Sequence, residues 1–396
     1  MSTPPPVTEQ TNELWGEDWP EVRALWQLEA TVSHLNHGAF GAVPTPVLED
    51  QQSWRARMEA NPARFFVREQ PEALALARAE IGEFLGAEPE TLAFVRNATA
   101  AISTVLSCIE LAPDDEILVT DHTYGAVRIA AERWATAAGA RVVVAHVPLR
   151  ASNDEVTAAV VDSVTDRTRL TIVDHVTSPT ARRMPLVTML PALKERGTDV
   201  FVDGAHAAGM LAVELDRLGA DFWAGNLHKW CCAPRGTAVL HVSSEHRGQM
   251  RPLVASWGEP AGFPESFNEV GTEDLTAWLA APRALRLLDQ LGFERLRQHN
   301  AELAVHGQRV LAEELGLDPA GLPRDAAVSM QLVPLPAGLA STPDEATALQ
   351  ARIGDQIAVE VAVTSWDGQG FLRLSAQAYN SPADYARLAA DLPALL

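Results

Sequence analysis

Lysine is almost absent from this sequence. Only two of its 31 basic residues, Lys194 and Lys229, are lysines, so arginine supplies nearly all of the positive charge. Lys194 lies at the polar end of an expected short helix, where a solvated charge explains it. Lys229 lies among Trp223, Leu227 and Trp230, and apolar surroundings lower the pKa of an amine. A neutral amine is the nucleophile of Schiff-base chemistry, and a snorkelling surface lysine is the alternative reading.

Cysteine and long apolar runs are also scarce. The three cysteines, Cys108, Cys231 and Cys232, are an odd set whose adjacent pair is poorly placed for a disulfide or a zinc knuckle. No apolar run approaches the length of a membrane span. Residues 1–10 have neither the basic nor the apolar region of a secretory signal. We therefore expect a reduced, cytoplasmic protein.

Acidic residues outnumber basic ones, 52 to 31. The formal net charge of −21 disfavours nucleic acid and anionic membranes as partners. The chain has 396 residues, 47% of them hydrophobic, which is enough for a large core and more than one domain. We expect an N-terminal arm at 1–33, a large domain at 34–280 and a smaller C-terminal α+β domain at 281–396.

Strand and helix patterns alternate from residue 91 onward. The expected strands are almost continuously apolar, and helical segments separate them, which predicts an α/β domain with a mostly parallel sheet covered on both faces. Seven strands are expected, at 91–96, 116–120, 141–146, 170–174, 200–203, 221–224 and 238–242. Ligands bind beyond the carboxyl ends of such strands. A helix at 274–291 then leads to a domain with strands at 328–333 and 371–375 and a helix at 343–354.

The residues that follow the strands form a consistent set. Thr99 opens a helix after the first strand, where its hydroxyl and the free backbone N–H groups can hold a phosphate or simply cap the helix. Tyr124 offers an aromatic face. Asp203 ends an apolar strand and needs a cation, such as a protonated ring nitrogen, unless it caps the turn at Gly204. With the amine of Lys229, these groups match the requirements of pyridoxal 5′-phosphate.

Five motifs carry a family resemblance over residues 35–379. They resemble fold-type I pyridoxal-phosphate enzymes of the aminotransferase class V family, in particular the isopenicillin N epimerase-like branch. The motifs are Leu35-Asn-His-Gly-Ala-Phe-Gly41, Asp121-His-Thr-Tyr-Gly-Ala126, Val202-Asp-Gly-Ala-His206, Gly225-Asn-Leu-His-Lys-Trp230 and Leu372-Arg-Leu-Ser375.

The resemblance implies a role for individual residues at the cofactor. Lys229 becomes the Schiff-base lysine, Asp203 the partner of the pyridine nitrogen and His206 a neighbour of the phenolic oxygen. Ser178, or Thr177 beside it, supports the same oxygen. The residues expected at the phosphate are Ala98, Thr99, Asn226 and His228. Tyr124 is expected to stack on the ring, with His122 as a competitor.

The resemblance also implies a substrate side and a partner subunit. Arg373 matches the arginine that binds the α-carboxylate of an amino-acid substrate, and its planar fork suits that task. Asn36 and His37 are expected to face the substrate as well. Thr272 looks like a residue that completes the phosphate site of a neighbouring subunit, which implies a homodimer.

The reaction is narrowed by what the chain lacks. Cysteine desulfurases need a nucleophilic cysteine on a loop before the carboxylate-binding arginine, and residues 355–370 contain none. Elimination of a β-thiolate needs only the lysine and a leaving group, whereas epimerisation needs a second acid. We therefore favour a C–S lyase acting on a cysteine S-conjugate in secondary metabolism. The alternatives are an epimerase of the isopenicillin N type, or decarboxylation or oxidative deamination of an S-conjugate.

Two further expectations concern metals and the substrate mouth. A metal site built from Asp203, His206 and His228 is disfavoured, since the nearby lysine repels a cation, and no metal is predicted. The family commonly has Gly after Ser-Pro-Thr, whereas this chain has Ala181 followed by two arginines. We expect that added bulk and charge to disfavour isopenicillin N itself as the substrate.

Overall fold

The computed structural model describes residues 20–396, so most of the expected N-terminal arm lies outside the described residues. The chain forms two compact units. Unit 2 holds Val47–Ser178 and Arg183–Leu285, and unit 1 holds the chain up to Pro46, Pro179–Arg182 and Arg286–Leu396.

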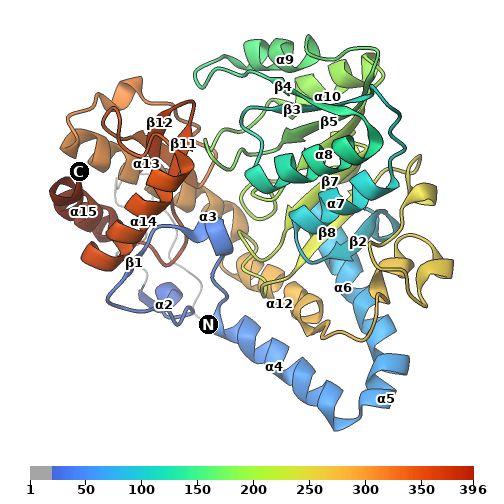
Figure 1. The fold of residues 1–396 in the computed structure, drawn as a ribbon. Helices are drawn as coiled ribbons and strands as arrows, with labels where there is room; N and C mark the ends of the chain where they lie inside the picture. The colour runs from blue at the N-terminus through green and yellow to red at the C-terminus, as the bar shows by residue number, and fades with distance from the viewer. Residues whose placement is uncertain (1–19) are drawn as a thin grey trace. The chain divides into compact units, whose positions relative to one another are not determined.

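Unit 2 is built on the expected seven-stranded sheet (Figure 1), with strand order β2-β8-β7-β6-β5-β3-β4. Only β8 runs antiparallel to its neighbours, so the predicted mostly parallel sheet is confirmed. The strands are β2 (Leu92–Val95), β3 (Glu116–Thr120), β4 (Arg141–Ala145), β5 (Thr168–Asp174), β6 (Asp199–Asp203), β7 (Phe222–Asn226) and β8 (Ala238–Val242).

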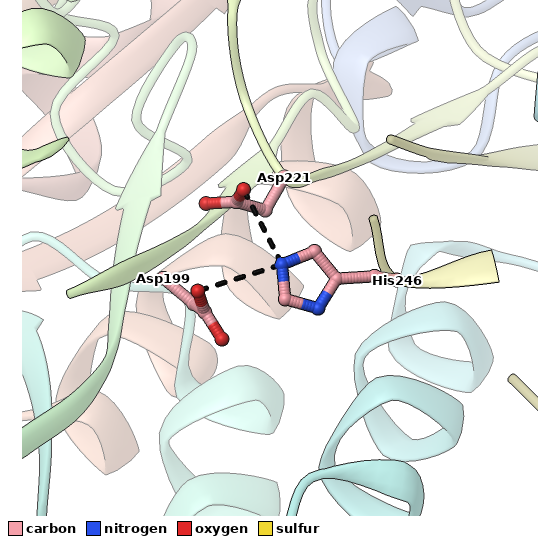
Figure 2. A group of neighbouring side chains, drawn as sticks. All are labelled: Asp199, Asp221 and His246. Carbon is pink, nitrogen blue, oxygen red and sulfur yellow. Dashed lines mark ion pairs between the residues drawn. The ribbon is translucent and has the colours of Figure 1, made fainter. Parts of the chain in front are cut away.

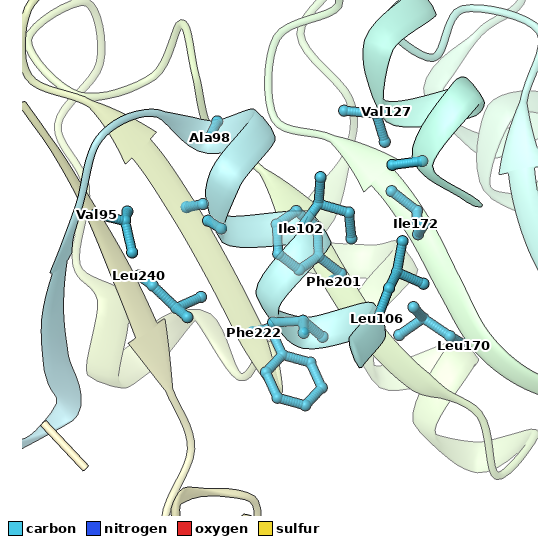
Figure 3. Packing of buried hydrophobic residues seen from close by; sticks show 14 of the residues in the cluster. Val95, Ala98, Ile102, Leu106, Val127, Leu170, Ile172, Phe201, Phe222 and Leu240 are labelled. Carbon is cyan, nitrogen blue, oxygen red and sulfur yellow. The ribbon is translucent and has the colours of Figure 1, made fainter. Parts of the chain in front are cut away.

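Helices connect these strands and cover the sheet. They are α6 (Gln70–Leu85), α7 (Ala98–Cys108), α8 (Gly125–Ala138), α9 (Asn153–Val161), α10 (Leu186–Glu195), α11 (Leu215–Leu218) and α12 (Thr276–Gln290), preceded by α4 (Thr45–Ala60), α5 (Pro62–Arg64) and a π-helical turn at Phe65–Glu69. Figure 3 shows Ile102 and Leu106 of α7 packed over Phe201, Phe222 and Leu240 of the sheet. This packing holds the first turn of α7 at the carboxyl edge of the sheet.

Unit 1 contains a three-stranded antiparallel sheet of order β11-β12-β9 and a two-stranded parallel ladder of β1 and β10. Its strands are β1 (Ser33–His34), β9 (Met330–Pro334), β10 (Val359–Glu360), β11 (Ala362–Trp366) and β12 (Gln369–Ser375), and its helices are α2 (Pro20–Arg23), α3 (His37–Phe40), α13 (Phe293–Glu314), α14 (Pro343–Ile357) and α15 (Pro382–Asp391). The sequence did not predict β10 and β11, because they are short and carry polar residues among apolar ones.

The segment from His34 to Pro46, expected in the large domain, instead clusters with unit 1. β1 pairs with β10, and the Ser375 N–H donates to the Leu35 carbonyl at 2.9 Å. Backbone pairing to the C-terminal part of the chain thus fixes the first motif. Among the described residues, no helix is long and apolar enough to cross a membrane.

Candidate active site

The carboxyl ends of the parallel strands place the expected residues of unit 2 at one edge of the sheet. Ala98 follows β2, Tyr124 follows β3, and Asp203 ends β6. Asn226 ends β7, and Lys229 lies in the turn after it. Parallel strands bring their carboxyl ends together, so these residues share one face of the unit, as the sequence predicts.

Lys229 is half-buried and hydrogen-bonded. Its Nζ lies 3.2 Å from Nε2 of His206, and the indole N–H of Trp230 donates to Nδ1 of the same imidazole at 3.3 Å. Lys229, the expected Schiff-base lysine, and His206, the expected neighbour of the phenolic oxygen, are therefore in direct contact. Trp230, which the resemblance left without a role, holds the histidine from the other side.

Asp203 is buried, with 4% of its surface exposed. Its Oδ1 accepts a hydrogen bond from the Ala205 N–H at 3.0 Å. Burial raises the pKa of its carboxyl, and the Ala205 N–H opposes this rise, as does Lys229 whenever its amine is protonated. A cationic group in contact with Asp203 relieves the cost of its buried negative charge.

Asp174 is a second buried carboxyl that the sequence analysis did not single out. It ends β5 directly opposite Asp203 in the parallel register, and its surface is 2% exposed. Burial, reinforced by the charge of Asp203, raises its pKa well above the ordinary value. Its one sequence signal is an acidic residue at the end of an apolar strand, which it shares with Asp203.

The first turn of α7 is organised by two asparagines. Asn97 caps the helix by accepting from the Ala100 N–H at 2.8 Å, and Asn226 Oδ1 accepts from the Ala98 N–H at 3.0 Å. Among the described residues no acceptor is recorded for the Thr99 N–H, and its side chain is half-buried. Helix capping and anion binding therefore coexist here, with Thr99 as the donor that remains for a phosphate.

His228 has one ring nitrogen already engaged. Its Nδ1 lies 2.9 Å from the Thr237 carbonyl oxygen, which only accepts, so Nδ1 carries a proton. Burial lowers the pKa of the imidazole, and in the neutral ring Nε2 is an acceptor. His228 can donate to a phosphate only as an imidazolium, which a bound anion favours.

Exposure separates the candidates for stacking and for the ring oxygen. Tyr124 is 46% exposed, whereas His122 is fully buried with Nε2 2.7 Å from the Val147 carbonyl oxygen. A ring can stack only on a side chain with an accessible face, which favours Tyr124. Of the two candidates for the ring oxygen, Thr177 is fully buried and Ser178 is half-buried, which favours Ser178.

Two glycines of the motifs make room for one tryptophan. An added Cβ on Gly204 or Gly225 would lie 2.2 Å or 2.1 Å from the Trp223 ring. The indole is thus packed between the backbones that carry Asp203 and Asn226, and its N–H donates to His175 Nδ1 at 3.4 Å. This packing explains why both motifs contain glycine next to a functional residue.

Unit 1 carries the expected substrate residues. Arg373 lies on β12 and is 5% exposed, next to the fully buried Leu372 and Leu374. Asn36 is half-buried, and its Oδ1 has no hydrogen-bond partner among the described residues. A buried acceptor of this kind is costly unless a ligand or water donates to it, which is consistent with a binding role.

His37 uses both ring nitrogens within unit 1. Gln377 Oε1 accepts from Asn300 Nδ2 and from the Ala378 N–H, each at 2.8 Å, so its amide nitrogen is the atom that donates to His37 Nε2 at 3.3 Å. Nδ1 then carries the proton and donates to the Tyr379 hydroxyl at 2.9 Å. His37, which the resemblance implies would face the substrate, is thus bound to Tyr379, a contact that the sequence analysis did not predict.

The aminotransferase class-V family model matches residues 35–388. The chain belongs to this family. The isopenicillin N epimerases of Streptomyces clavuligerus and Amycolatopsis lactamdurans are 33% and 34% identical to it, over 96% and 95% of this chain and 98% of each relative. The probable chloroplastic L-cysteine desulfhydrase of Arabidopsis thaliana is 29% identical over 93% of this chain and 85% of the relative.

A solved structure supports the fold independently. The cystine C–S lyase C-DES, in complex with its product cysteine persulfide, has a TM-score of 0.79 and 22% identity over 92% of this chain and 97% of that chain. The predicted family and fold class are confirmed. Pyridoxal phosphate is the cofactor of the class V family, and unit 2 fits it: it offers an amine, a buried carboxylate, a helix start with a remaining donor and an accessible aromatic ring.

The cysteines next to the class V lysine are unsuited to nucleophilic chemistry. Cys231 and Cys232 are buried, and burial raises the pKa of both thiols, that of Cys232 to about 12. They are therefore protonated at neutral pH and behave as core residues. Residues 355–370 fold as the end of α14, β10, β11 and a tight turn rather than as a long loop.

A separate cluster of three potential metal ligands lies at the opposite edge of the sheet, where β6 and β7 begin (Figure 2). The ligating atoms of Asp199, Asp221 and His246 all lie within 4.8 Å of one another. Hydrogen bonds to Asp199 and Asp221 raise the pKa of His246 to about 9, and Lys194 pairs with Asp221. These cations already neutralise the carboxylates, so the cluster is an ion-pair network. Lys194, expected to be a solvated charge, is one of its members.

Proposed function

We propose that this class V protein is a pyridoxal-phosphate-dependent C–S lyase that acts on a cysteine S-conjugate. The observation that carries the proposal is the 3.2 Å contact between the Lys229 amine and His206, which supports a role for the amine in proton transfer. Bound pyridoxal phosphate withdraws electrons from the Cα of an amino acid attached to it. Lys229 takes the Cα proton, the Cβ–S bond breaks, and the thiolate leaves with its electron pair.

The surrounding residues have the roles that their contacts suit. With the cofactor bound, Asp203 would keep the pyridine nitrogen protonated, Thr99 would hold the phosphate, and Tyr124 would cover the ring. Ser178 would support the phenolic oxygen, and Arg373 would bind the substrate α-carboxylate through its planar fork. Water then completes the reaction, which yields pyruvate, ammonia and a free thiol. Lys229 serves both as the attachment point and as the base.

Epimerisation is the second candidate, because the isopenicillin N epimerases are 33% and 34% identical over almost the whole chain. It requires an acid on the face opposite Lys229. In unit 2 the neighbouring cysteines are buried and protonated, with pKa values too high to exchange protons readily. Elimination makes no such demand, and the desulfhydrase relative supports it. Decarboxylation or oxidative deamination of an S-conjugate remains a further route.

The proposal includes an oligomeric state, a cellular location and a metabolic role. Thr272 is exposed in the loop before α12, where it is accessible to a partner subunit, and we propose a homodimer in which it completes the neighbouring phosphate site. A cytoplasmic location is part of the proposal. Similarity to isopenicillin N epimerases supports a role in secondary metabolism.

One incubation separates the reactions. The purified protein is mixed with a cysteine S-conjugate in D₂O, and separately with an L-amino acid that has no β leaving group. Pyruvate and stoichiometric thiol from the first mixture support the lyase. Deuterium at Cα with loss of optical rotation in the second, without pyruvate in the first, would instead establish an epimerase.

A further inference from the structure

Trp230, His206 and Lys229 form a directed chain of hydrogen bonds. We infer that Trp230 is a positioning residue: its indole N–H fixes the tautomer of His206, and this tautomer keeps the Lys229 amine unprotonated and ready to capture the cofactor. The inference rests on the proposed role of Lys229 and adds to it the group that sets its protonation state.

The direction of the chain follows from donors and acceptors. An indole nitrogen only donates, so the 3.3 Å bond from Trp230 requires a lone pair on His206 Nδ1. A neutral imidazole with a lone pair on Nδ1 carries its proton on Nε2. Nε2 then donates to Lys229 Nζ at 3.2 Å. An ammonium group has no lone pair to accept this bond, so the arrangement selects the neutral amine.

The backbone fixes the relative placement of these residues. Trp230 is 1% exposed and His206 is also 1% exposed, so neither side chain is free to turn towards solvent. An added Cβ on Gly209 would lie 2.4 Å from the carbonyl carbon of Trp230, so the segment that begins with His206 lies directly against the segment that carries Lys229. Close backbone packing therefore holds the imidazole between the indole and the amine.

Other charged groups in unit 2 also act on the amine. Asp203, on β6, attracts an ammonium when it is ionised, whereas burial raises its pKa and weakens this pull. His228 precedes Lys229, and its charged form repels an ammonium, although burial lowers its pKa and keeps it neutral. On β5, burial and the charge of Asp203 raise the pKa of Asp174, which therefore adds little negative charge near the amine. The His206 bond is the contact among them that distinguishes the amine from the ammonium by geometry.

The tautomer is tested by nitrogen NMR of the full-length protein labelled with ¹⁵N-histidine, with His206 assigned from a His206→Gln variant. We expect the Nε2–H form in the wild type. An Nδ1–H form or an imidazolium at neutral pH would overturn the inference, and this result needs no bound cofactor. Trp230→Phe, which keeps a ring but loses the N–H, is expected to lose the preference.

The amine is tested by the rate at which the full chain, purified without added cofactor, captures pyridoxal phosphate at different pH values. Removing the indole donor lets His206 accept a hydrogen bond from an ammonium. Trp230→Phe should therefore raise the midpoint of the pH profile of capture by about one pH unit. Below that midpoint, capture should be about tenfold slower than in the wild type. The matched control is Trp223→Phe, which loses a similar bond to His175. An unchanged midpoint in folded Trp230→Phe, or equal shifts in both variants, would contradict the inference. If neither variant nor wild type captures the cofactor, the proposed function fails and the NMR result stands alone.

Discussion

Asp174 and Asp203 lie directly opposite each other at the ends of β5 and β6, and both carboxyls are buried. Two carboxyls in such positions cannot both ionise cheaply. Burial raises both pKa values, and the charge of Asp203 raises that of Asp174 further. In the proposed holoenzyme, a cationic ring nitrogen would give Asp203 its counter-charge. The buried pair lowers the stability of the cofactor-free protein, and we predict that cofactor binding reduces this cost.

Replacing Asp174 tests this account through stability. A carboxyl whose folded pKa is raised binds more protons in the native state, so its favourable contribution is complete below the unfolded pKa and is lost as the pH rises through the folded pKa. Asp174→Asn should therefore stabilise the cofactor-free protein at neutral pH, by about 1.4 kcal/mol for every pH unit that separates the folded pKa from the unfolded one. Denaturant unfolding at several pH values measures this change.

Asp221→Asn is the control for that prediction. Burial opposes ionisation of Asp221, but hydrogen bonds from His246 and Lys194 outweigh it and hold its pKa below the ordinary value. Its contribution is therefore present above the unfolded pKa, and the variant should lose stability at neutral pH. If Asp174→Asn is destabilising to the same degree as Asp221→Asn, the interpretation of the pair is wrong.

The His246 network predicts a loss of stability in mild alkali. The folded pKa of His246 is about 9, above the unfolded value of 6.5, so its contribution is complete below pH 6.5 and disappears as the pH rises through 9. The free energy of unfolding should fall across this window by at most roughly 3 kcal/mol, because partial exposure to solvent screens the ion pairs. His246→Gln should flatten the fall. A wild-type profile already flat between these pH values would show that the imidazolium is not stabilised.

Thr99 and Asn97 are expected to separate cofactor affinity from helix stability. Thr99→Ala removes a hydroxyl donor at the start of α7 and should weaken cofactor binding by about 1–2 kcal/mol with little change in unfolding. Asn97→Ala removes the cap on the Ala100 N–H and should cost about 1 kcal/mol of stability. Equilibrium dialysis and denaturant unfolding measure the two quantities. Equal effects of both variants on stability alone would assign Thr99 to capping.

The sequence predicted the parts of the fold that depend on local pattern. Continuous apolar runs indicated the strands of the large sheet, and the rarity of lysine drew attention to Lys229. β11 escaped prediction because Ala362–Trp366 mixes small, polar and aromatic residues, and its strand character depends on pairing with β12.

The sequence indicated which residues lie at the strand ends of unit 2, but it could not indicate the hydrogen bonds between them. Asn226 Oδ1 accepts a hydrogen bond from the N–H of Ala98, 128 positions earlier in the chain, so this N–H is already engaged within the protein. The link between Trp230 and His206 likewise needs two segments to pack together. Asp174 resembles any acidic residue at a strand end until the register places it opposite Asp203.

Ala181 departs from the family pattern at a position with a left-handed backbone. Its φ is 49°, in the left-handed region that glycine adopts without steric cost, so alanine at this position carries local strain. The nearby Arg183 adds positive charge, and burial together with this charge lowers the pKa of His175 to about 4. The positive charge of Arg183 thus lowers the pKa of His175.

The central claim is that Lys229 holds the cofactor, and the scarcity of lysine makes it directly measurable. The purified full-length protein is reconstituted with pyridoxal phosphate, reduced with borohydride, digested and analysed by mass spectrometry. The chain has only two lysines, so Lys194 serves as an internal control. We expect loss of the visible absorbance and a pyridoxyl group on Lys229 alone. A colourless protein after reconstitution, or modification of Lys194 in place of Lys229, would contradict the account.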